Sequence, residues 1–256
     1  MKTIILNKSQ IYKGDLILVN AHYPVHSHSV EGFSMVDEKY PDVRMKRNAV
    51  NALQCIFEKI GCADQIVAVS GHRSLAEQEE IYDGSMRDNG RSFTESYVAL
   101  PNHSEHHTGL AIDLGLKQEV IDFIRPDFPY EGICNEFRKT APYYGFIERY
   151  QSDKEKITGI SHEPWHFRFV GYPHSEVMDK EHLSFEEYIE YIRNFTYNKE
   201  HLRIVGNEGK EIEIFFVPCH TEKVEITLPE HSIYQVSGNN VDGFIVTVWG
   251  RQNEQE

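Results

Sequence analysis

The chain has 256 residues, of which 40% are hydrophobic and 26% are charged, so it fits a soluble globular protein with one large domain, alone or with a small appendage. Its formal net charge of −14 argues against a nucleic-acid-binding protein, which needs a basic face. The opening stretch, MKTIILNKSQIYKG, contains an apolar run too short for a signal-peptide core or a membrane span. We therefore expect a cytoplasmic protein without a membrane anchor.

The cysteines are spaced too widely for a Cys-x-x-Cys pair, so no structural zinc knot is indicated. We expect them to be buried thiols in a reducing compartment: Cys55, Cys62, Cys134 and Cys219.

The first half of the chain alternates between predicted strands and helices. GDLILVN (14–20) predicts an early strand, and apolar residues at helical spacing predict a helix over 42–60 that Gly61 ends. QIVAVSG (65–71) predicts a short buried strand. Ser74 and Glu77 form a capping box, which predicts a helix from Leu75 to about Tyr82, followed by a polar loop, GSMRDNGRSF.

The second half continues this mixture and then changes. Alternation of Leu110, Ile112 and Leu114 predicts a strand, and further elements are expected as a helix over 131–140, a strand over 166–171 and a helix from Ser184 to about Phe195. From about residue 200, the short alternating segments HLRIV, EIEIFFV, KVEITL and FIVTVWG predict strands, and SGNNVDG (237–243) predicts a hairpin turn.

These elements indicate an α+β fold, with mixed helices packed on a central, mainly antiparallel sheet and a small C-terminal all-β appendage. We place the main domain over 1–199 and the appendage over 200–256.

The stretch SEHHTGLAIDLG (104–115) is the first to suggest chemistry. Asp113 lies within the predicted strand and points to the opposite side from its apolar neighbours. His106 lies seven residues earlier, and the intervening glycine turn allows both side chains to approach one metal ion.

The second such stretch is SHEPWHFRFVG (161–171), in which residues 162–166 match the text pattern H-E-x-x-H. That zinc motif requires a helix, and Pro164 disfavours helical backbone at Glu163. We therefore retain Glu163 and His166 in an extended segment, with His162 as an alternative ligand.

Together these residues make a catalytic zinc set. His106, Asp113 and His166 supply two imidazoles and one carboxylate, and a fourth position stays open for water, whose pKa zinc lowers to about 7. Glu163 is then placed to act as the general base and acid. Arg73, in SGHRS at the end of a predicted strand, is a candidate to stabilise an oxyanion, or else forms a structural salt bridge.

The order Arg73, Ser104-x-His106-x6-Asp113 and Glu163-x-x-His166 resembles that of the zinc D,D-peptidases, which include D-alanyl-D-alanine carboxypeptidases and dipeptidases. The resemblance spans about 14–192 and is strongest to the vancomycin-resistance enzymes of VanXY and VanY type. It implies zinc ligation by His106, Asp113 and His166, and acid–base catalysis by Glu163. It also implies oxyanion stabilisation by Arg73.

The resemblance further implies that Ser104 and Gln78 help to hold the substrate and that Trp165 walls the pocket. Without it, Ser104 could cap a turn and Gln78 could lie on an exposed helix face. The implied substrate is a small peptide, either free D-Ala–D-Ala or a muramyl pentapeptide, and hydrolysis of its terminal bond implies vancomycin resistance.

Two other functions remain open from the sequence. Phage endolysins of related architecture cut L-Ala–D-Glu bonds in cell walls, and Hedgehog-type domains of related fold keep a zinc site without an established peptidase role. The sequence does not decide between dipeptidase and carboxypeptidase, and it leaves the oligomeric state and the task of the appendage unassigned.

Overall fold

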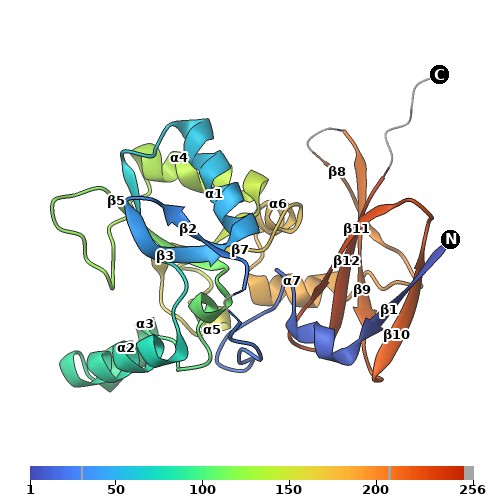
Figure 1. Ribbon diagram of the computed structural model, residues 1–256, viewed down its shortest axis with the longest axis horizontal. Helices are drawn as coiled ribbons and strands as arrows, with labels where there is room; N and C mark the ends of the chain where they lie inside the picture. The colour runs from blue at the N-terminus through green and yellow to red at the C-terminus, as the bar shows by residue number, and fades with distance from the viewer. Residues whose placement is uncertain (30, 207–208, 251–256) are drawn as a thin grey trace. The chain divides into compact units, whose positions relative to one another are not determined.

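The structure is a computed structural model that describes residues 1–29, 31–206 and 209–250 (Figure 1). The chain forms two compact units, one of residues 19–185 and one that combines residues 1–18 with 186–256. The sequence pattern predicts a division after residue 199, whereas the packing of the chain groups residues 1–18 with those from 186 onwards. The N-terminal strand belongs with the β-rich unit because it pairs with a strand near residue 225.

The larger unit is built on a four-stranded sheet with the order β4-β5-β7-β6. All three strand pairs are antiparallel, as the predicted α+β fold requires. The strands are β4 (Ile66–Ser70), β5 (Ala111–Leu116), β6 (Phe146–Tyr150) and β7 (Glu163–Phe169). The two central strands are almost wholly buried, so their side chains are held firmly from both faces.

Helices pack beside this sheet, and Phe137 contacts both Phe57 and the strand residue Phe167. Ala49, Val50, Leu53 and Ile56 are buried at helical spacing on α1 (Arg47–Ile60), which lies beside α4 (Gly132–Thr140) (Figure 1). The remaining elements of the unit are β2 (Phe33–Asp37), β3 (Tyr40–Lys46), α2 (Leu75–Asp88), α3 (Arg91–Tyr97), η2 (Glu105–Thr108), η3 (Ala141–Tyr144), α5 (Glu155–Thr158) and α6 (His174–Lys180). Gly61 ends α1 in the left-handed conformation, as predicted.

Several predicted elements differ from the structure. Residues 14–20 form no strand. The backbone of this segment hydrogen-bonds to side chains and to carbonyl groups of turns rather than to a neighbouring strand; for example, the Leu18 N–H donates to Asn239 O. The helix expected from residue 42 begins at Arg47, since 40–46 pair with β2.

The predicted polar loop after Tyr82 is also helical. α2 keeps its predicted capping box but continues to Asp88, and α3 follows beside it. The buried hydroxyls of Ser85 and Thr94 hydrogen-bond each other at 2.8 Å, which joins the two helices where the sequence shows only polar residues.

The smaller unit is β-rich, as expected for the region after residue 200. A sheet of order β11-β12-β9-β8 and a pair β1-β10 enclose a core that includes Phe215, Phe244 and Ile226. The strands are β1 (Lys2–Asn7), β8 (Leu202–Val205), β9 (Glu211–Pro218), β10 (Lys223–Leu228), β11 (Ile233–Gly238) and β12 (Gly243–Trp249), and η1 (Lys8–Tyr12) follows β1. The predicted turn at 237–243 joins β11 to β12 as a hairpin. α7 (Phe185–Ile192) is shorter than predicted.

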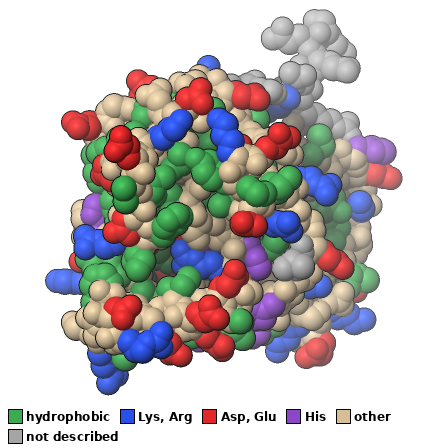
Figure 2. Space-filling model, turned by 60° about the vertical axis from the view of Figure 1, so that its left-hand side comes forward, with side chains coloured by type: hydrophobic (Ala, Val, Ile, Leu, Met, Phe, Trp, Pro, Cys, Tyr) green, Lys and Arg blue, Asp and Glu red, His purple; other side chains and the backbone are tan. Residues whose placement is uncertain are grey.

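None of the helices in the described ranges is long and apolar enough to cross a membrane. On the face drawn in Figure 2, acidic side chains are scattered among basic and hydrophobic ones, so the net charge of −14 is not gathered into one patch there.

Candidate active site and metal centre

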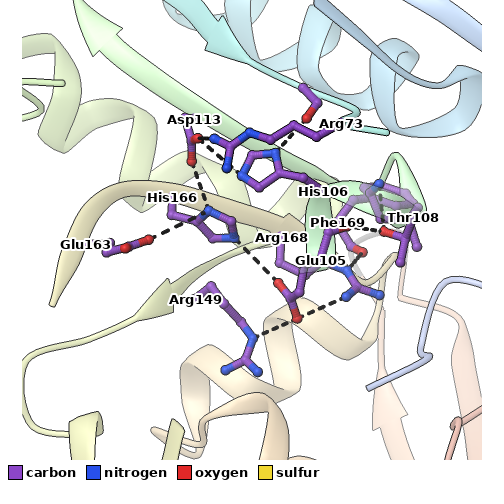
Figure 3. A network of polar contacts seen from close by, with 12 residues as sticks. Arg73, Glu105, His106, Thr108, Asp113, Arg149, Glu163, His166, Arg168 and Phe169 are labelled. Atoms are coloured by element: carbon purple, nitrogen blue, oxygen red, sulfur yellow. Dashed lines mark hydrogen bonds and ion pairs between the residues drawn. The ribbon is translucent and has the colours of Figure 1, made fainter. Parts of the chain in front are cut away.

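The three predicted metal ligands meet at the centre of the larger unit. Asp113 on β5 lies directly opposite His166 on β7 in the strand register, and His106 comes from the η2 turn that precedes β5. One ligand atom from each lies within 4.8 Å of the other two (Figure 3). All three residues are buried, so neighbouring atoms fix their positions.

Asp113 lies between the two imidazoles. Its Oδ1 is 2.9 Å from His166 Nδ1, and its Oδ2 is 3.2 Å from His106 Nε2. His106 donates its Nδ1–H to the carbonyl of Gly71 at 2.6 Å, which leaves Nε2 as the nitrogen available to a metal.

Two of the three groups are already in the form that binds a cation, whereas His166 carries a proton that it must lose first. Burial lowers the pKa of His106 to about 4, so this imidazole is neutral at pH 7. Burial would also lower the pKa of His166, but the hydrogen bond to Asp113 and the nearby carboxylates of Glu105 and Glu163 raise it to about 9. Despite burial, the two histidines and Arg73 hold the pKa of Asp113 well below its usual range. Two imidazoles and one ionised carboxylate form a donor set that zinc accepts, so the residues fit that metal.

Glu163 lies beside the three ligands at the first residue of β7. Its Oε2 is 3.9 Å from His166 Nδ1, and the side chain is buried. Burial raises the pKa of Glu163 to about 8, close to the pH at which a general base and acid works best.

Arg73 reaches the same point from the segment after β4. It donates from Nη2 to Asp113 Oδ2 at 2.7 Å and from Nε to Ser70 Oγ at 2.9 Å. The salt bridge considered from the sequence is therefore present, and its partner is a predicted metal ligand.

A cavity of about 300 Å³ opens onto these groups. Its lining contains every site residue named from the sequence: Arg73, Gln78, Ser104, His106, Asp113, Glu163, Trp165 and His166. Gln78 is 1% exposed rather than on an open helix face; its Nε2 donates to Ala99 O, and its Oε1 has no partner among the described residues. The Ser104 side chain makes no capping bond to the η2 turn that it precedes.

The H-E-x-x-H pattern is not a helical zinc motif here, because Glu163 and His166 lie on a strand. His162 hydrogen-bonds Tyr130 Oη at 2.7 Å and does not line the cavity.

Several lining residues were missed from the sequence. Glu105 and Tyr150 touch His166, while Phe123 and Ile124 border the cavity from the segment after β5. Glu105 directly precedes His106 in the sequence, so an acidic residue next to a predicted ligand was the signal that could have identified it.

Comparison with known proteins gives one family and several close relatives. A family model described as VanY, D-alanyl-D-alanine carboxypeptidase, matches residues 42–172. A D-alanyl-D-alanine carboxypeptidase of Enterococcus faecium is 32% identical over 259 residues, which cover 95% of this chain and 78% of the relative. The bifunctional D-Ala-D-Ala dipeptidase and carboxypeptidase VanXYC of Enterococcus gallinarum is 42% identical over 152 residues, which cover 59% of this chain and 80% of the relative.

A solved structure also matches nearly the whole chain. The vancomycin-resistance D,D-dipeptidase VanXYg, in complex with a D-Ala-D-Ala phosphinate analogue, is similar with a TM-score of 0.95 and 56% identity. The match covers 97% of this chain and 98% of that structure.

Proposed function

Because the chain belongs to the VanY family of D-alanyl-D-alanine carboxypeptidases, we propose that it is a zinc-dependent D,D-peptidase. It hydrolyses the D-Ala–D-Ala bond of the free dipeptide, of muramyl-pentapeptide precursors, or of both. Loss of that terminal group removes the target of vancomycin, so the activity supports vancomycin resistance.

One observation carries this proposal: His106, Asp113 and His166 converge at the cavity, with Glu163 beside them. His106 Nε2, the Asp113 carboxylate and His166 Nδ1 would hold the zinc ion. When bound, zinc supplies a Lewis acid that polarises a carbonyl and lowers the pKa of water.

The chain's own residues would carry the proton and orient the peptide. Glu163 takes a proton from the attacking water and returns it to the leaving amine, for which its raised pKa is suited. Arg73 lines the cavity, and its guanidinium donates to the carbonyl oxygen as negative charge develops there.

Three further residues would hold the substrate. The unpartnered Oε1 of buried Gln78 can accept a hydrogen bond from a substrate N–H. Ser104 offers a hydroxyl near the substrate's terminal carboxylate, and Trp165 forms an apolar wall.

The catalytic task would lie in the first part of the chain, since each of these residues comes from within 1–199. We also propose a cytoplasmic location, which the four free thiols support because a reducing compartment keeps cysteines in this form. Cys62, Cys134 and Cys219 are buried as expected, whereas the expectation was wrong for Cys55, which is exposed.

The test is a side-by-side rate measurement on D-Ala–D-Ala and UDP-muramyl-pentapeptide. We expect the zinc-loaded protein to release D-Ala from at least one of them, a chelator to abolish the release, and added zinc to restore it. Absence of release from both substrates contradicts the proposal. Lysis of purified cell walls without release of D-Ala would indicate the L-Ala–D-Glu alternative.

A further inference from the structure

A buried cluster of three charges lies behind the metal centre. Glu105 is 2% exposed, and its Oε1 accepts hydrogen bonds from Arg149 Nε at 2.9 Å and Arg168 Nη1 at 3.0 Å (Figure 3). Both guanidiniums are themselves buried, and each lies over the ring of Phe185. Three ionised side chains are costly to bury, which points to a role for this cluster beyond packing.

The other carboxylate oxygen faces a metal ligand. Glu105 Oε2 lies 3.5 Å from His166 Nε2, and neither atom has a hydrogen-bond partner among the residues that the structure describes. The separation exceeds an ordinary N–H···O bond by a few tenths of an ångström. On its opposite side, the same imidazole points Nδ1 toward Asp113.

We propose that Glu105 is a positioning residue for the metal site: it accepts the Nε2–H of His166 and so directs the Nδ1 lone pair to the metal. The inference rests on the proposed zinc-binding function. The η2 turn then has two roles, because it provides His106 as a ligand and Glu105 as the hydrogen-bond acceptor for His166. Such partners of ligating histidines typically contribute 10–100-fold to metal affinity.

The two arginines determine which oxygen is left for His166. Because both donate to Oε1, the carboxylate cannot turn without losing two charge-assisted bonds. In Glu105→Gln the same donors select the amide oxygen, so the amide NH2 faces His166 Nε2. A donor there favours the tautomer with its proton on Nδ1, which is unable to ligate.

The experiment measures zinc affinity by chelator competition for the wild type, Glu105→Gln and a matched control, Glu148→Gln. Glu148 also pairs with an arginine, Arg138, at 2.6 Å, but it does not line the cavity. We expect the zinc Kd to rise 10–100-fold in Glu105→Gln and to stay within twofold in Glu148→Gln. The tautomer of His166 is read in parallel by NMR of ¹⁵N-histidine-labelled, zinc-loaded protein.

An unchanged zinc Kd in folded Glu105→Gln overturns the inference, and wild-type hydrolysis of D-Ala–D-Ala then leaves the proposed function standing. A wild type that binds no zinc overturns both. If Glu105→Gln does not fold, the wild-type spectrum decides: an Nε2–H proton of His166 shifted strongly downfield, as in a hydrogen bond to a carboxylate, supports the inference, and one at the shift of an imidazole without such a bond overturns it.

Discussion

Zinc binding should release a proton, because one of its ligands is protonated in the metal-free protein. The pKa of His166 is about 9, so near neutral pH its Nδ1 carries a proton that a metal must displace. His106, with a pKa of about 4, is already neutral, and Asp113 is already ionised. Among the three ligands, only one proton therefore competes with the metal between pH 6 and 8.

The size of the effect follows from that single proton. At pH 7, below the pKa of His166, only about 1% of the imidazole is neutral, which weakens the apparent zinc affinity by about 3 kcal/mol. The zinc Kd should fall about tenfold for each unit of pH increase from 6 to 8 and level off above 9. Below pH 5, protonation of His106 adds a second competing proton and steepens the dependence.

The assay is chelator competition from pH 5 to 10, corrected for the titration of the chelator. Calorimetry at pH 7 in buffers of different ionisation enthalpy counts the released protons directly, and we expect about one. A zinc Kd that is constant from pH 6 to 8, with no proton released, refutes the inference that His166 is charged in the metal-free protein and loses a proton when zinc binds.

Three substitutions test other parts of the site and the core. Glu163→Ala should lower kcat by about 10²–10⁴-fold while zinc content is unchanged, and an unchanged kcat would remove Glu163 from acid–base catalysis. Arg73→Lys should lower kcat by about 10²–10³-fold because one donor to the developing oxyanion is lost; a change confined to KM would contradict that role. Phe137→Ala, at a fully buried ring that contacts Phe128 and Phe167, should lower the free energy of unfolding in urea by about 3–5 kcal/mol, and a loss below 1 kcal/mol would contradict its place in the core.

The residues of the predicted ligand set could be picked from the sequence because its signals are local or motif-like, and the structure brings these residues together. The Asp113 strand, the Ser74 cap and the proline after Glu163 each act over a few residues, and the structure places them as expected. All eight predicted site residues then line one cavity.

What the sequence missed depends on distant partners. Glu105 is buried because Arg149 and Arg168, 44 and 63 residues away in sequence, converge on it, and no local periodicity reveals such a contact. The strand β1 likewise depends on pairing with β10, more than 200 residues later. The expected strand over 14–20 failed for the opposite reason: residues 16–19 are apolar and buried, but among the described residues no strand pairs with them.

A crystal structure of the zinc-soaked protein, with anomalous data collected at the zinc edge, tests the metal centre most directly. We predict one ion bound by His106 Nε2, an Asp113 carboxylate oxygen and His166 Nδ1, at about 2.0–2.2 Å from each. An ion bound by His162, or one that leaves any of these three residues uncoordinated, would contradict the account.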